Sequence, residues 1–301
     1  MELLSKTKLA KVIHVNSDEC VNCHACIAAC PVKFCNDGSG DTVMVNEDMC
    51  IACGQCIKAC SHKARSIIDD FNLFINDLNN NTKIICIVAP SVVASFPKTY
   101  KHLNGWLKSL GIPFIYDVSF GAELTVKSYV DYLQQKSPNT LIAQPCPSIV
   151  SYIQIYKPEL IEHLAPADSP MVHSMKMIQE FYPEYSDYKI AALSPCAAKK
   201  REFEETGYGD YLLTFQSINN YLEKNNIQLN DFPEHNYDNP KAERAVNFST
   251  PGGLLKTIER WIPDIGDNSR KIEGPDKTYT YLNQLTNNID KGIAPLLIDC
   301  L

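Results

Sequence analysis

The chain has 301 residues, of which 45% are hydrophobic and 21% are charged, and its formal net charge is −7. These values are ordinary for a globular protein, and the negative charge gives no reason to expect a nucleic acid or an anionic membrane as a partner. The first fifteen residues, MELLSKTKLAKVIHV, contain no signal-peptide core, and no apolar run is long enough to span a membrane, so we expect a cytoplasmic location.

Thirteen cysteines are many for such a chain, and nine of them lie between residues 20 and 60. In a reducing compartment, metal ligation or catalysis explains them better than disulfides do. They form two copies of the spacing C-x2-C-x2-C-x3-C, which is typical of two-cluster ferredoxins. In that pattern three thiolates surround one 4Fe-4S cubane and the fourth reaches the other cluster. The expected ligand sets are Cys20, Cys23, Cys26 with Cys60, and Cys50, Cys53, Cys56 with Cys30.

The two copies belong to an internal repeat of thirty residues, in which KVIHVNSDEC and DTVMVNEDMC each place a short strand before the cysteine loop. A structural zinc site, which four thiolates also form, is the weaker alternative. Cys35 lies outside both copies, and we interpret it as a buried or loop thiol. The segment 66–82, SIIDDFNLFINDLNNNT, predicts a helix that ends at an asparagine-rich stop. We therefore expect an α+β ferredoxin-like domain over residues 1–80.

Short apolar runs alternate with helix-like stretches in the rest of the chain, which predicts an α/β domain with parallel sheets over residues 81–301. Ligands of such sheets bind at the carboxyl ends of the strands. Cys146, Cys196 and Cys300 each close an apolar run, so we predict that they converge on one crevice; the alternative for each is a buried, inert thiol. The runs are KIICIVA, FIYDV, TLIAQ, KIAAL, RAVNFS and APLLID, and the helix-like stretches include GAELTVKSYVDYLQQK and SIVSYIQIYKPELIEHL.

From the ferredoxin cysteines onward, the chain resembles the iron-only (FeFe) hydrogenase family. The resemblance is carried by IVAPSVVASFP (87–97), YDVSFGAELTVKSYVDYL (116–133), AQPCPSIVSYI (143–153) and LSPCAAKKREFE (193–204). The last stretch is the most specific, because family members place a lysine three residues and a glutamate six residues after a proline-cysteine pair. Here the lysine is Lys199 and the glutamate is Glu202.

The resemblance implies that Cys146 and Cys196 ligate the cubane of an H-cluster, which joins a 4Fe-4S cluster to a diiron site. It implies that Lys199 donates to a cyanide ligand of the distal iron, a task that suits a compact cation with three donors. Ala89, Pro90 and Ser91 would line the diiron pocket. We interpret Lys200 and Arg201, in the same motif, as a solvated charge run.

Three departures from the family pattern predict a slow or sensory member. Productive members carry a proton-relaying cysteine directly before the first ligand, where this chain has Pro145. Their relay glutamates in the helix after SFGA (119–122) are replaced here by Ser128, Tyr129 and Tyr132, and a tyrosine with a pKa of about 10 is a poor relay at neutral pH. The third family motif, with two closely spaced cysteines, is missing, so we expect a longer parent protein that supplies it after Leu301.

The resemblance implies an oxidoreductase that handles H2, protons and electrons, with the two N-terminal clusters as its electron path. Its partner would be a redox protein such as a ferredoxin, or a signalling domain, and neither nucleic acid nor a membrane. The alternative is a non-catalytic iron-sulfur protein, either an electron carrier or a cluster-assembly factor. A diiron subcluster would distinguish the two.

Overall fold

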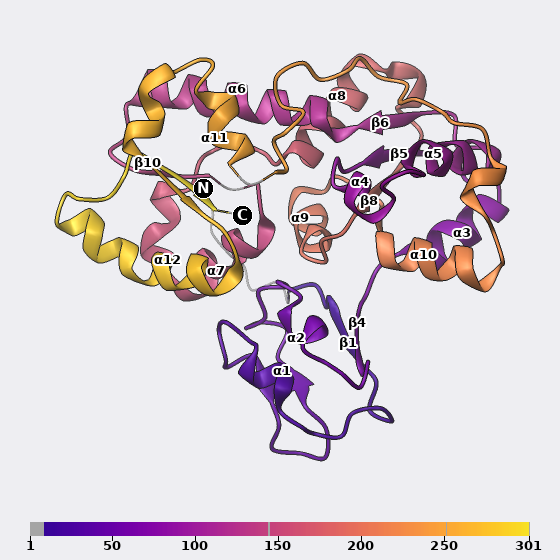
Figure 1. Ribbon diagram of the computed structural model, residues 1–301, viewed down its shortest axis with the longest axis horizontal. Helices are drawn as coiled ribbons and strands as arrows, with labels where there is room; N and C mark the ends of the chain where they lie inside the picture. The colour runs from indigo at the N-terminus through magenta and orange to yellow at the C-terminus, as the bar shows by residue number, and fades with distance from the viewer. Residues whose placement is uncertain (1–8, 144, 251, 301) are drawn as a thin grey trace.

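The structure is a computed structural model that describes residues 9–143, 145–250 and 252–300. A small N-terminal region lies below a larger part that has two lobes side by side (Figure 1). Within the described ranges, none of the helices combines the length and the apolar character that a membrane span needs.

The N-terminal region is built from short elements that follow the thirty-residue repeat. Two four-residue helices, α1 (Ala25–Ala28) and α2 (Gln55–Lys58), occupy equivalent places in the two copies. Strand β1 (Ile13–Val15) pairs antiparallel with β4 (Arg65–Ile67), and β2 (Asn36–Asp37) pairs antiparallel with β3 (Met44–Val45). In Figure 1, α2 lies between α1 and the two lobes.

The first lobe contains a four-stranded parallel sheet in the order β6-β5-β8-β9. All five residues of β5 are apolar and buried, as expected for a parallel strand that is covered on both faces. The strands are β5 (Ile84–Val88), β6 (Ile115–Asp117), β8 (Lys189–Ser194) and β9 (Tyr211–Thr214). The accompanying helices are α3 (Phe71–Asn79), α4 (Val92–Ser95), α5 (Tyr100–Ser109), α9 (Lys199–Thr206) and α10 (Phe215–Lys224).

The second lobe contains a three-stranded parallel sheet in the order β10-β11-β7. Helices α6 and α8 pack against each other along the top of the molecule (Figure 1). Gly121 permits this packing, because a Cβ there would lie 2.2 Å from the carbonyl oxygen of Pro170. The elements are β7 (Leu141–Ile142), β10 (Ser269–Ile272), β11 (Leu297–Cys300), α6 (Val118–Lys136), α7 (Pro147–Tyr156), η1 (Pro158–His163), α11 (Gly253–Ile258) and α12 (Pro275–Asp290). Helix α8 (Pro170–Phe181) instead buries Met171, Met175 and Ile178 in the core of the first lobe.

The ferredoxin-like region and the parallel sheets agree with the fold class expected from the sequence, but three local predictions were wrong. RAVNFS is a series of turns, because Ala245 and Phe248, three residues apart, fill one core while the carboxylate of Glu123 accepts a hydrogen bond from the Arg244 amide at 2.7 Å. Helix α3 begins only at Phe71, since the residues before it include β4. The helix predicted over 148–164 stops at Tyr156, because Pro158 cannot continue it and starts a 3-10 turn.

Candidate functional site

The two cysteine loops share a backbone conformation that suits iron-sulfur binding. Residues with positive φ recur thirty positions apart, at Asn22 and Ala52, at His24 and Gly54, and at Lys33 and Lys63. Left-handed residues next to right-handed ones turn successive backbone N–H groups toward a common centre, and such concave nests bind anionic clusters. The repeat is thus present in the backbone as well as in the cysteine spacing, and both copies offer the same kind of cradle.

The thiols expected to form the second set lie together. The pKa of the Cys53 thiol is raised to about 12, mainly by burial and in part by the neighbouring Cys30, Cys56 and Cys50. In the first set, Cys20 acts in the same way on the pKa of Cys26, whose rise is caused mainly by burial. Of the eight predicted ligands, Cys26, Cys30, Cys50 and Cys56 are buried, Cys20, Cys53 and Cys60 are half-buried, and Cys23 is exposed.

Cys35 is a ninth thiol of this region, and it contacts the second set. It is only 3% exposed, and its Sγ lies 3.3 Å from the Sγ of Cys30. Hydrogen bonding with Cys35 lowers the pKa of Cys30 to about 6 and that of Cys50 to about 7. Among the described residues, no three His, Cys, Asp or Glu side chains are grouped as a single metal ion would need. The donor chemistry and the cradles of both loops fit 4Fe-4S clusters.

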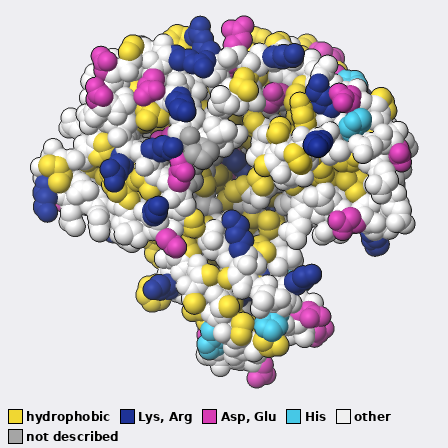
Figure 2. Space-filling model, in the orientation of Figure 1, with side chains coloured by type: hydrophobic (Ala, Val, Ile, Leu, Met, Phe, Trp, Pro, Cys, Tyr) yellow, Lys and Arg dark blue, Asp and Glu magenta, His cyan; other side chains and the backbone are white. Residues whose placement is uncertain are grey.

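A second candidate site is a cavity of about 260 Å³ between the two lobes, at the carboxyl ends of strands from both sheets. Figure 2 shows the hollow between the lobes, with many apolar side chains around it. Cys146 reaches the cavity from the β7–α7 connection of the second lobe, and Cys196 reaches it from the β8–α9 connection of the first. Ala89, Pro90 and Ser91, after β5, also line it. Cys300 is the last residue of β11 and is fully buried in its sheet, near enough to Cys146 for their charges to interact.

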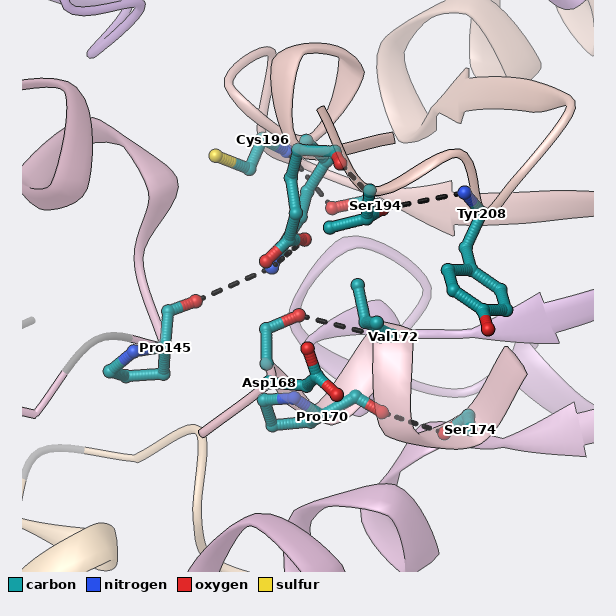
Figure 3. Close-up of polar contacts among 12 residues, drawn as sticks. Pro145, Asp168, Pro170, Val172, Ser174, Ser194, Cys196 and Tyr208 are labelled. Atoms are coloured by element: carbon teal, nitrogen blue, oxygen red, sulfur yellow. Dashed lines mark hydrogen bonds and ion pairs between the residues drawn. The ribbon is translucent and has the colours of Figure 1, made fainter. Parts of the chain in front are cut away.

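Lys199 points its ammonium group toward this cavity from the first turn of α9. It is 7% exposed, and its Nζ donates to Glu202 Oε2 at 2.7 Å and to the carbonyl oxygen of Pro145 at 3.4 Å (Figure 3). Glu202 does not line the cavity; it lines a neighbouring space of about 170 Å³ together with Asp168 and Glu205. Glu202 therefore holds Lys199 in position from the side of this neighbouring space, and Lys199 is the residue of the pair that can contact a group bound in the cavity.

The ligand thiols of this cavity sit in a low-polarity environment. The pKa of the Cys196 thiol is raised to about 11, mainly by burial and in part by the charge of Cys146. The Cys196 backbone N–H donates to Ser194 Oγ at 3.2 Å, which shapes the turn after β8 (Figure 3). Helix α6 contributes only Val118 and Ala122 to the described lining, whereas Ser128 donates to the Leu124 carbonyl of its own helix. No acidic side chain lines the described part of this cavity.

Four lining residues, Pro170, Met171, Phe248 and Ser249, were not anticipated from the sequence. Met171 comes from the first turn of α8, and Phe248 and Ser249 come from the segment that was expected to be a strand. Their contribution depends on how α8 and the 244–249 turns fold back over the lobes, and no local pattern indicates it.

Arg201 was interpreted as part of a solvated charge run, and this was wrong. It is 5% exposed and donates to three backbone carbonyls of the N-terminal region: to Ala10 at 3.2 Å, to Glu47 at 3.0 Å, and to Cys50. Lys200 is not free either, since its Nζ lies 2.6 Å from Asp70 Oδ1. Tyr156 adds a bond of 2.6 Å from its hydroxyl to the Met49 carbonyl. The loop of the second cysteine set is thus anchored to the helix that follows Cys196.

Replacing Arg201 by methionine should loosen the N-terminal region from the lobes. The change leaves three carbonyls without their charged donor, and an unsatisfied buried polar group costs about 1–3 kcal/mol. We expect a lower urea midpoint and faster hydrogen exchange over residues 45–52. Arg270→Met, at an exposed position, is the matched control. Equal exchange in both variants would show that Arg201 does not hold this contact.

The chain matches the model of the iron only hydrogenase large subunit, C-terminal domain, over residues 82–289, and that of a 4Fe-4S dicluster domain over residues 19–65. It is 28% identical to iron hydrogenase 1 of Clostridium pasteurianum, over 86% of this chain and 53% of that protein. It is 26% identical to the periplasmic Fe hydrogenase large subunit of Nitratidesulfovibrio vulgaris, over 83% of this chain and 67% of that protein. The chain thus spans about half the length of the first relative and about two thirds of the second.

Solved structures show the same fold. A variant of the FeFe-hydrogenase HydA1 from Chlamydomonas reinhardtii superposes with a TM-score of 0.60 at 16% identity, covering 78% of this chain and 82% of that one. A structure that reports stepwise H-cluster assembly in HydA gives a TM-score of 0.56 at 21% identity, covering 66% and 58%. Since the hydrogenase model alone matches more than half of the residues, the chain belongs to the iron-only hydrogenase family and carries a 4Fe-4S dicluster region ahead of the hydrogenase domain.

Proposed function

We propose that this chain is the electron-transferring and substrate-cavity part of an FeFe-hydrogenase-type oxidoreductase, which interconverts H2 with two protons and two electrons. The observation that carries the proposal is the cavity between the lobes, where Cys146, Cys196 and Lys199 meet the Ala89–Ser91 turn. When bound there, an H-cluster would supply the iron at which H2 is split or formed. Cys146 and Cys196 would hold its cubane, and Lys199, held by Glu202, would donate to an anionic ligand of the diiron site.

The arrangement of the N-terminal region supports one direction for the electron path. The first cysteine set includes the exposed Cys23 and the helix α1, which is farther from the lobes (Figure 1). The second set includes Cys50, whose carbonyl is bound by Arg201 of α9. We propose that electrons are exchanged with a partner redox protein at the first set and with the cavity through the second.

Slow turnover, of the kind a sensory protein tolerates, is part of the same proposal. Pro145 has no ionisable group, and α6 presents only apolar side chains to the described cavity lining. Proton delivery would then limit the rate, because a positioned relay group typically contributes a factor of about 10²–10⁴. The competing function is that of an iron-sulfur carrier without diiron chemistry.

Metal analysis of the full-length natural protein, reconstituted anaerobically, tests the proposal. Two cubanes account for roughly eight irons and about eight sulfides per chain, and the proposal requires a further cubane and a diiron site. We also expect H2-dependent reduction of a viologen dye. Eight irons, with no dye reduction after a synthetic diiron complex is supplied, would favour the plain carrier.

A further inference from the structure

A buried arginine lies between the two cysteine sets of the N-terminal region. Arg65 is the first residue of β4 and is 5% exposed. Its Nη1 donates to Asn36 Oδ1 at 2.8 Å, and its Nη2 donates to the Val43 carbonyl at 2.9 Å. Both acceptors are neutral. In the described part of the chain, no carboxylate oxygen forms an ion pair with this guanidinium.

An arginine cannot become neutral by losing its proton in a protein, so a nearby anion stabilises a buried one beyond what neutral acceptors provide. Its surroundings connect it to both sets. Strand β4 packs against α2, which carries Cys56, and its acceptor Asn36 lies on β2, which packs against α1, which carries Cys26. A 4Fe-4S cluster with four thiolate ligands is anionic, and reduction adds one more negative charge. The two clusters are therefore the anions that can balance Arg65.

Only one of the two copies of the thirty-residue repeat has a cation at this position. Arg65 follows the last cysteine of its run by five residues, and Cys35 occupies the equivalent place in the first copy. Cys35 is a thiol that contacts Cys30, and Asn36 links the two positions: its Nδ2 donates to Cys35 Sγ at 3.4 Å while its Oδ1 accepts from Arg65. One copy of the repeat thus has a neutral group where the other has a cation; Arg201 adds another buried cation at the Cys50 carbonyl, on the side of the second set.

We propose that Arg65 is the counter-cation shared by the two 4Fe-4S clusters and that it raises the reduction potential of both. A fixed positive charge stabilises the more negative, reduced state more than the oxidised state. It acts strongly because it is buried, where neither water nor salt screens it well. The inference depends on the dicluster region alone and does not require hydrogenase activity.

The test is a redox titration of the reconstituted full chain, followed by electron paramagnetic resonance of the two clusters. Arg65→Gln should move both midpoint potentials to more negative values. At a fixed potential, we expect at least a tenfold fall in the ratio of reduced to oxidised cluster, which corresponds to about 59 mV for a one-electron couple. Arg65→Lys keeps the charge and should leave the potentials near those of the natural protein. Lys11→Gln removes the same charge from an exposed position just before β1, the strand that pairs with β4, and is the matched control.

Iron content distinguishes the remaining outcomes. If Arg65→Gln does not retain eight irons while Arg65→Lys does, with unchanged potentials, the charge itself holds the clusters and the proposal is supported. If both variants lose iron equally, Arg65 acts through shape or its forked hydrogen bonds, and the proposal is wrong. It is also wrong if Arg65→Gln shifts the potentials no more than Lys11→Gln does.

Discussion

Replacing Cys196 by alanine should abolish the signal of a third iron-sulfur cluster in the full-length natural protein and leave the two N-terminal clusters intact. The thiol lies at the end of β8 and lines the cavity, and alanine offers no ligand in its place. Cys146→Ala should have the same effect, because this thiol reaches the same cavity from the other lobe. Electron paramagnetic resonance of the reduced protein, together with iron analysis, measures the loss.

Cys86→Ala provides the matched control for this experiment. Cys86 is a fully buried thiol in the centre of β5, where burial raises its pKa, and it does not line the cavity. Its replacement tests what the loss of any core thiol does to the fold and to cluster assembly. If the third signal survives in both the Cys146 and Cys196 variants, the two thiols do not share a cluster. If Cys86→Ala abolishes the signal as well, the loss reports a fault in folding.

Replacing Pro145 by cysteine should raise H2 turnover, by as much as the factor of about 10²–10⁴ that a positioned relay group contributes. The new thiol would stand at the cavity lining directly before Cys146, which is where productive relatives are expected to carry theirs. The backbone carbonyl of residue 145, which accepts from Lys199 Nζ, remains in the variant. The measurement is H2 uptake in ordinary and heavy water, with a smaller solvent isotope effect expected in the cysteine variant.

Pro145→Ala separates proton relay from a change in loop stiffness. Alanine removes the fixed φ of proline, as cysteine does, but adds no ionisable group. The prediction requires that Pro145→Ala keeps the low turnover and the large isotope effect. Equal turnover and equal isotope effects in the natural protein and the cysteine variant would instead place the slow step elsewhere, for example in electron supply through the N-terminal clusters.

Anchoring contacts between the N-terminal region and the lobes bear on both experiments. Arg201 joins the loop of Cys50 to the helix that follows Cys196, and Tyr156 joins Met49 of the same loop to the helix that follows Cys146. Variants of the cavity should therefore be checked for intact N-terminal clusters, since the two sites share this connection.

The amino-acid sequence alone determined the ferredoxin-like region and the alternating strands and helices of the lobes. Cluster ligands within one loop must converge over a few residues, so their spacing is a local property, and the repeat of left-handed residues follows the same period. Apolar runs such as IICIV likewise predict buried parallel strands without reference to the rest of the chain. The placement of Cys146 and Cys196 at strand ends was visible for the same reason.

Only the tertiary structure decided which of these residues meet. Cys146 and Cys196 follow strands of different sheets, so their approach depends on how the two lobes face each other. The 244–249 segment was wrongly predicted to be a strand. Its apolar residues reach the core from a series of turns, and Glu123 of α6 stabilises these turns by accepting a hydrogen bond from the Arg244 amide. Arg65 and Arg201 have charged side chains that a sequence places at the surface by default. Each is buried because carbonyl and amide oxygens far away in the chain are brought within hydrogen-bonding distance, and that convergence has no local signature.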